Sequence, residues 1–218
     1  MIPRLAVLLL MLGLAAPAMG QGSGLALARW TLESVPPNAI VVAQNEADTG
    51  ALRDLQAHGL RPDVQVIRAD DPGASALITS WASAAQPVVG TLTLDPETFG
   101  RVAPAVVSAG AYQRPGRADE PPFDLAAAET AGAICGADFA GPHEGIVDLG
   151  SVVLFQLLQT AVSHAQAGDA PAAERAYVRA RTFAAEAHLA DDPLVGIARE
   201  WIDDALTARP APTLPSAP

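Results

Sequence analysis

The chain has 218 residues and a formal net charge of −11, because 24 acidic residues outweigh 13 basic ones, all of them arginine. Half of its residues are hydrophobic, which is enough to build a core and excludes general disorder. The negative charge argues against nucleic acids and anionic membranes as partners, since both would repel it.

Residues 1–20 have the pattern of a secretory signal peptide. Arg4 supplies a positive start, residues 5–16 are apolar, and residues 18–20 form a small-x-small cleavage site. The apolar run is shorter than the about 20 residues that a membrane-spanning helix needs, although an uncleaved N-terminal anchor is the alternative. We therefore expect an exported, soluble protein with no membrane span after cleavage, periplasmic if the source is a Gram-negative bacterium.

Residues 21–114 alternate between helix and strand patterns. Helices are predicted over 25–34 and 46–58, and Asp-Pro pairs predict two further helix starts at 71–72 and 95–96. Short apolar runs bounded by turn residues predict strands over 39–43, 64–67 and 88–94, with a last strand within 105–112. This alternation predicts an α/β domain with a small, mostly parallel sheet of three to four strands and flanking helices.

The rest of the chain changes character. Residues 115–148 have the composition of a linker or irregular segment, with partial helix near 125–132. Residues 149–208 are predicted to be helical, as a hairpin of helices over 153–167 and 171–188 followed by one helix over 193–208. The proline-rich tail, 209–218, is predicted to be disordered.

The segment 168–180 carries the most informative pattern of the second half. Gly168 falls at a turn between two helices, Ala173 and Ala180 are small packing positions, and Tyr177 is the large residue between them. This segment resembles the second half of a tetratricopeptide repeat, and the resemblance extends over about residues 154–187. The alternative is an ordinary antiparallel helical hairpin. Either one implies packing or partner binding and not catalysis, and a single repeat must bury its face against other helices.

A second resemblance covers about residues 35–114. It rests on Val-Pro-Pro-Asn-Ala-Ile-Val-Val at 35–42, Asn-Glu-Ala-Asp-Thr at 45–49 and Gly-Leu-Arg-Pro-Asp-Val-Gln-Val at 59–66. These runs are similar to the soluble region of polytopic bacterial membrane proteins of unknown function that look like protein O-mannosyltransferases. The membrane-embedded part, where sugar transfer would lie, has no counterpart here. The resemblance therefore implies a freestanding module and not an active glycosyltransferase.

Acidic and amide side chains follow the predicted parallel strands, whose carboxyl ends commonly form ligand sites. The candidate ligand-binding residues are Asn45, Glu46, Asp48, Asp70 and Asp95, with Asp71 beside them. Several carboxylates on one rim could bind a hard cation such as Mg²⁺ or Ca²⁺. Alternatively, these residues cap helices or favour the helix dipole. Arg61 and Asp63 have a similar double interpretation, as a local ion pair or as a ligand contact.

Other patterns predict no catalytic residues, cofactor or metal site. No glycine pattern of a nucleotide-binding loop and no nucleophile elbow is present. The lone Cys135 is expected to be buried, with pairing to another chain or a reactive thiol as the alternatives, and together with His143 it offers only two metal ligands.

These observations favour an interaction or accessory module of the bacterial envelope that binds another envelope protein. Its predicted partner-binding residues are Phe155, Tyr177, Phe183 and Trp201, for which core packing is the alternative. A second interpretation is an enzyme domain that binds a small ligand or divalent cation at the acidic loops. A third is a subunit of a larger envelope complex whose acidic surface meets a basic partner.

Overall fold

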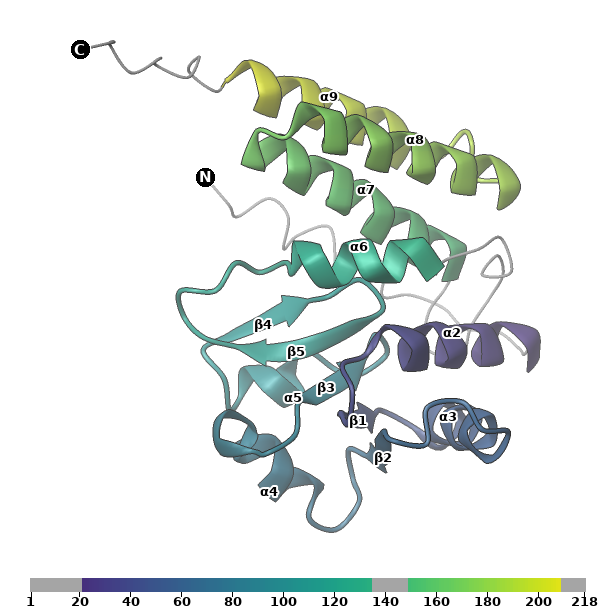
Figure 1. The fold of residues 1–218 in the computed structure, drawn as a ribbon, viewed down its shortest axis with the longest axis vertical. Helices are drawn as coiled ribbons and strands as arrows, with labels where there is room; N and C mark the ends of the chain where they lie inside the picture. Colours follow the sequence, from purple (N-terminus) through teal and green to yellow (C-terminus); the bar gives the residue numbers. More distant parts are fainter. Residues whose placement is uncertain (1–20, 135–148, 209–218) are drawn as a thin grey trace. The chain divides into compact units, whose positions relative to one another are not determined.

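The computed structural model describes residues 21–134 and 149–208 (Figure 1). The chain divides into two compact units, Met1–Val153 and Leu154–Pro218. The predicted leader, Cys135, His143 and the proline-rich tail lie outside the described residues.

The first unit is built on a mixed five-stranded sheet (Figure 1). In chain order its strands are β1 (Ile40–Ala43), β2 (Gln65–Arg68), β3 (Val88–Thr91), β4 (Ala105–Ser108) and β5 (Tyr112–Gly116). Across the sheet their order is β2-β1-β3-β5-β4. Both β2 and β3 run parallel to β1, whereas β5 is antiparallel to β3 and to β4. The central strand β1 is therefore paired on both sides, and it is buried along its whole length.

The α/β class is confirmed, but the predicted sheet of three to four mostly parallel strands was too small and too parallel. The strand that was missed is β5, whose Arg114-Pro115-Gly116 sequence resembles a linker. Proline is tolerated there because the pairs between β5 and β3 are Gly90↔Gln113 and Thr91↔Tyr112, so Pro115 lies beyond them. At Pro115 the side of β5 that faces β3 is therefore like the free side of an edge strand. The proline has no N–H to donate, but no hydrogen bond to β3 is expected there.

Helices cover both faces of the sheet, as the alternation of side chains along β1 requires. Val41 and Ala43 belong to one core cluster, which lies against α2 (Gln21–Ser34), α3 (Glu46–Ala57) and α6 (Leu125–Ile134). Ile40 and Val42 belong to a second cluster, which lies against α4 (Ala74–Thr79), the 3₁₀ turn Trp81–Ser83 and α5 (Glu97–Gly100). Both faces are thus closed by apolar packing.

Each of the two Asp-Pro pairs precedes a short helix, α4 or α5, and α4 begins only at Ala74, after the predicted start at 71–72. The N-cap residue of α4 is Gly73, with a left-handed φ of 88°, so Asp71 does not cap this helix. The helix α5 is a single turn after Pro96. The strand β3 ends at Thr91 instead of residue 94, because the chain turns there and returns Leu94 to the core.

Side chains of α2 fasten it to two later parts of the first unit. The indole Nε1 of Trp30, a residue only 1% exposed, donates to the carbonyl of Ala131 on α6 at 2.8 Å. The hydroxyl of Thr31 donates to the carbonyl of Ala111 at 3.3 Å. The position of α2 therefore depends on residues 80 to 101 positions further along the chain.

The second unit contains most of α7 (Leu149–Ala167), together with α8 (Ala170–Glu186) and α9 (Pro193–Thr207). Both α8 and α9 start with an aspartate cap followed by proline in the first turn: Asp169 accepts from Ala172 N and Asp192 from Leu194 N. Gly168 takes a φ of 80° between α7 and α8, a left-handed conformation that glycine adopts without strain. The helical hairpin followed by one helix agrees with the sequence prediction.

Candidate functional site

The carboxyl ends of the three parallel strands meet at one edge of the sheet, as predicted. The registers Ala43↔Arg68 and Val42↔Gly90 bring the ends of β1, β2 and β3 level with one another. The helix α3, between β1 and β2, covers one face, whereas α4, between β2 and β3, covers the other. The edge between β1 and β3 is therefore a topological switch point, the usual place for a ligand in an open α/β sheet.

Asn45 is used at this edge as the N-cap of α3. Its side-chain oxygen accepts from Asp48 N at 2.8 Å, and its carbonyl accepts from the hydroxyl of Thr49 at 2.7 Å. Its backbone is extended, with φ −136°, as is typical of a cap residue. The amide of Asn45 thus satisfies one of the free N–H groups of the first helical turn.

Asp48 is buried, with 6% of its surface exposed, and its carboxylate accepts from the hydroxyl of Thr93. The Thr93 hydroxyl also lies 2.8 Å from that of Thr91 at the end of β3. Gln113 of β5 donates to the carbonyls of Thr91, at 3.1 Å, and of Leu94. A chain of hydrogen bonds therefore joins the start of α3 to the loop after β3. Sequence patterns missed the threonines and the glutamine, since none of them belongs to a motif.

Arg68, at the end of β2, neutralises the acidic residues beside it. Its guanidinium forms ion pairs with Glu46 and Asp70, and its backbone N–H donates to the carboxylate of Asp71 at 2.8 Å. The hydrogen bond to Asp70, reinforced by its charge, raises the pKa of Arg68, so the guanidinium stays protonated. An arginine that ends a strand gives no distinctive sequence signal, and the sequence analysis missed this role.

Asp95 closes the loop after β3 instead of joining the other carboxylates. Its backbone N–H donates to the side-chain oxygen of Gln44 at 3.0 Å, and its own carboxylate accepts from Glu97 N at 3.0 Å. Asp95 therefore holds the loops after β1 and β3 together and satisfies the start of α5.

The five predicted ligand residues thus share an edge, but each of them bonds to other groups of the chain. Within residues 21–134 and 149–208, no three His, Cys, Asp or Glu side chains are grouped so that they could hold a metal ion. Asn45 and Asp95 accept from N–H groups at helix starts, Glu46 and Asp70 pair with Arg68, and Asp48 accepts from Thr93.

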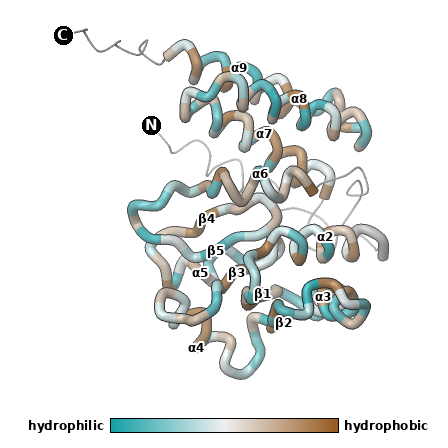
Figure 2. Tube along the Cα trace, in the orientation of Figure 1, coloured by the Kyte–Doolittle hydropathy of each residue, from teal (hydrophilic) through white to brown (hydrophobic). Residues whose placement is uncertain are grey.

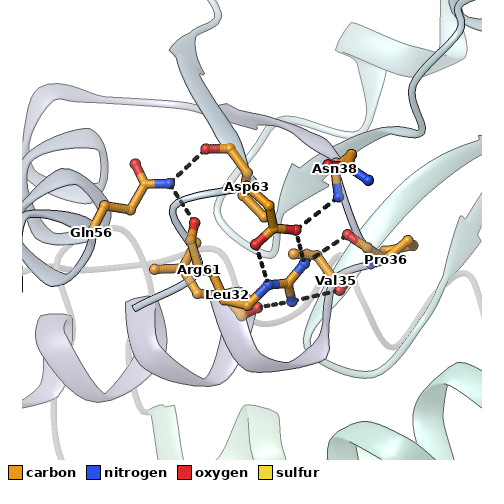
Figure 3. Close-up of polar contacts among 8 residues, drawn as sticks. Leu32, Val35, Pro36, Asn38, Gln56, Arg61 and Asp63 are labelled. Atoms are coloured by element: carbon orange, nitrogen blue, oxygen red, sulfur yellow. Dashed lines mark hydrogen bonds and ion pairs between the residues drawn. The ribbon is translucent and has the colours of Figure 1, made fainter. Parts of the chain in front are cut away.

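Arg61 and Asp63 belong to a dense group of hydrogen bonds between the end of α2 and the loop before β2 (Figure 3). The guanidinium donates to both Asp63 oxygens, at 2.8 and 2.9 Å. Its remaining N–H groups donate to the carbonyls of Leu32 at 2.7 Å, Val35 at 2.9 Å and Pro36 at 3.0 Å. All five donors of the arginine are therefore used. We call this group, Arg61 with Asp63 and the three carbonyls, the arginine clamp.

The clamp exists because prolines end α2. The carbonyl of Leu32 would normally accept from the N–H four residues later, but that residue is Pro36, which has none. Arg61 supplies the missing donor from the loop before β2. Asp63 in turn accepts from Asn38 N at 2.8 Å, and the hydrogen bonds from Arg61 and then Asn38 lower its pKa well below the usual range.

A glutamine holds the backbone of this loop from the other side (Figure 3). Gln56 of α3 donates to the carbonyls of Arg61, at 3.0 Å, and Val64, at 2.6 Å. Arg61 has a left-handed φ of 47°, a conformation that residues other than glycine keep only where surrounding contacts fix it. Because every polar atom of the guanidinium has a partner within the chain, the local ion-pair interpretation fits this geometry and a ligand contact does not.

The four predicted partner-binding residues divide between core and surface. Tyr177 and Phe183 of α8 are buried, and the hydroxyl of Tyr177 donates to the carbonyl of Val195 at 3.1 Å. Phe155 of α7 is half-buried. Trp201 of α9 is 36% exposed. The first two therefore serve packing between α8 and its neighbours, whereas Trp201 offers an apolar surface to solvent.

The surface of α8 and α9 also carries large hydrophobic residues that the sequence analysis did not single out. Val178 is 52% exposed and Ile197 is 38% exposed. Helical periodicity indicates which residues of a helix share a face, but it does not tell which apolar positions find a partner helix.

No protein-family model matches the chain, and the searches of curated proteins and of solved structures find no match either. Among the helices of the described residues, none combines the length and the apolar character that crossing a membrane requires.

Proposed function

We propose that the protein is an exported interaction module of the bacterial envelope, which binds another envelope protein through the surface of α9. The observation that carries this proposal is the pair Ile197 and Trp201. They are four residues apart and therefore neighbours on the helix surface, and both remain exposed although they are large and apolar. Tryptophan is strongly enriched among the residues that dominate binding energy at protein interfaces.

The distribution of exposed apolar side chains supports this choice of surface. Over the described parts of the chain, the exposed large hydrophobic residues are Leu25, Val178, Ile197 and Trp201. Three of the four lie on α8 and α9, whereas single exposed hydrophobic residues elsewhere need no explanation. The resemblance of this region to a tetratricopeptide repeat and the leader-like start of the chain are consistent with an exported binding module.

The competing interpretation, a ligand or cation site at the acidic strand ends, has less support. A ligand site needs a few polar groups that converge on the position of the ligand. At this edge Asn45 caps a helix, Asp48 accepts from Thr93, and Arg68 already pairs with the exposed acids.

The test is capture of a partner from an envelope extract with the tagged full-length chain and two variants. Ile197→Ala with Trp201→Ala removes the proposed contact, and Leu25→Ala, an equally exposed leucine of α2, is the matched control. We expect the double variant to reduce recovery of a specific protein by about tenfold or more, the effect of losing an interface hot spot.

Circular dichroism must show unchanged helix content for both variants. The proposal is refuted if the double variant recovers as much of every enriched protein as the wild type. It is also refuted if nothing is enriched over an unrelated acidic bait.

A further inference from the structure

The outward face of α8 carries three basic residues. Arg175, Arg179 and Arg181 are all exposed, and Val178 lies between them with 52% of its surface exposed. The opposite face of the helix, with Ala173, Tyr177, Ala180 and Phe183, is buried. We call Arg175, Val178, Arg179 and Arg181 the arginine face. In Figure 2, α8 alternates between hydrophobic and hydrophilic positions, as a helix with one buried face does.

The arginines of this face have no acidic partner in the parts of the chain that the structure describes. Among the other arginines of the described residues, Arg61, Arg68, Arg101, Arg114 and Arg199 form ion pairs, whereas Arg29, Arg53 and Arg117 do not. The acid nearest in sequence, Glu174, is already engaged, since its carboxylate accepts from Nη1 of Arg199 at 2.7 Å. Arg175 and Arg179 lie one turn apart, so their like charges repel each other on the helix surface. The face therefore keeps a local positive charge on a chain whose net charge is −11.

We propose that the arginine face binds an acidic segment of a partner protein. Carboxylates of the segment would pair with Arg175 and Arg179, and an apolar side chain would cover Val178. Arginine suits this role because its planar guanidinium binds a carboxylate through two parallel hydrogen bonds. This inference rests on the proposed binding role of the helices and adds the chemistry of the partner.

Charge favours a protein segment over a larger anionic surface. Interactions between exposed charges are screened beyond about 8–10 Å at physiological ionic strength, so a segment seated on α8 interacts mainly with the arginine face. A bilayer or a nucleic acid is wide enough to meet the surrounding acidic surface of the protein as well. The net charge of −11 opposes that approach.

The test measures binding of a fluorescent acidic peptide to the full-length chain. The probe is a helical peptide of about 20 residues with glutamates and leucines on one face, and a second probe has each glutamate replaced by glutamine. The test variant is Arg175→Gln with Arg179→Gln. Its matched control is Arg29→Gln with Arg117→Gln, which removes the same charge from two exposed arginines that lack ion pairs in the described residues.

We expect the acidic probe to bind the wild type and to lose about three- to thirtyfold in affinity with the test variant, the range that two exposed ion pairs supply. The affinity of the control variant for the acidic probe should stay within about twofold of the wild-type affinity. The wild type should bind the glutamine probe no more tightly than the test variant binds the acidic probe. The proposal is overturned if both variants weaken binding equally, or if the glutamine probe binds as well as the acidic one.

Two further outcomes would assign the face to another occupant and overturn the proposal. One is binding to vesicles with anionic lipid, but not to the peptide, through the same arginines. The other is self-association of the chain that Arg175→Gln with Arg179→Gln abolishes. Failure of the peptide assay leaves the α9 capture experiment intact, because that experiment depends on Ile197 and Trp201 and not on these arginines.

Discussion

Replacing Arg61 by methionine tests whether the arginine clamp holds the end of α2. Methionine keeps the apolar stem of the side chain but removes all five donors. The carbonyls of Leu32, Val35 and Pro36 then lose the guanidinium as a hydrogen-bond partner. Asp63 loses its ion pair at the same time.

The expected loss follows from the number and exposure of these bonds. A hydrogen bond from a charged donor contributes about 1.5–3 kcal/mol, and three of them reach backbone carbonyls. The Arg61 side chain is 22% exposed, so water replaces part of what is removed. We therefore expect Arg61→Met to lower the free energy of unfolding by about 2–4 kcal/mol, which corresponds to a Tm lower by about 4–16 °C.

Urea unfolding, followed by tryptophan fluorescence in a Trp201→Phe background that leaves Trp30 and Trp81 of the first unit, measures this loss. Arg61→Lys keeps the charge without the forked geometry, so it should lose most of the same free energy. Arg29→Met, on the exposed side of α2, should change stability by less than about 0.5 kcal/mol. If Arg61→Met is as mild as Arg29→Met, the clamp does not stabilise α2.

The remaining predictions concern pH and packing. Because the pKa of Asp63 is lowered in the folded state, its contribution is complete above the unfolded pKa of about 3.9 and is lost as the pH falls below that value. Acid unfolding of Asp63→Asn should therefore show a weaker pH dependence, and an unchanged profile would exclude Asp63 as its source. Gly90→Ala should destabilise by about 1–3 kcal/mol in thermal unfolding, because the new methyl group would lie 2.4 Å from the Leu94 side chain. Gly50→Ala, in open space within α3, should stabilise the protein by about 0.5–1 kcal/mol. If Gly90→Ala were instead more stable than Gly50→Ala, the packing described around Gly90 would be wrong.

The elements that sequence predicted well are those whose signal is local. The strand β1 is a continuous apolar run because both of its edges and both of its faces are covered. The starts of α8 and α9 carry aspartate followed by proline, and both aspartates act as caps. Such signals depend on neighbouring residues alone, and the sequence contains them in full.

The elements that sequence missed depend on residues far apart in the chain. The strand β5 contains Pro115, which is tolerated because the pairing of β5 with β3 stops at Gln113. The acidic residues after the parallel strands lie at one edge of the sheet, but the role of Arg68 as the counterion of Glu46 and Asp70 depends on the register of β2.

The manner in which α2 ends also determines when that helix can become stable during synthesis. An isolated helix of its 14 residues is marginal in water. The carbonyls at and just after its end accept hydrogen bonds from Arg61, which lies between 25 and 29 residues later in the chain. Its indole anchor on Ala131 lies 101 residues later. Although α2 is the first of the helices that the structure describes, it is therefore among the last of them to gain its full set of contacts, and a chain interrupted before Arg61 would present α2 without the partners that hold it.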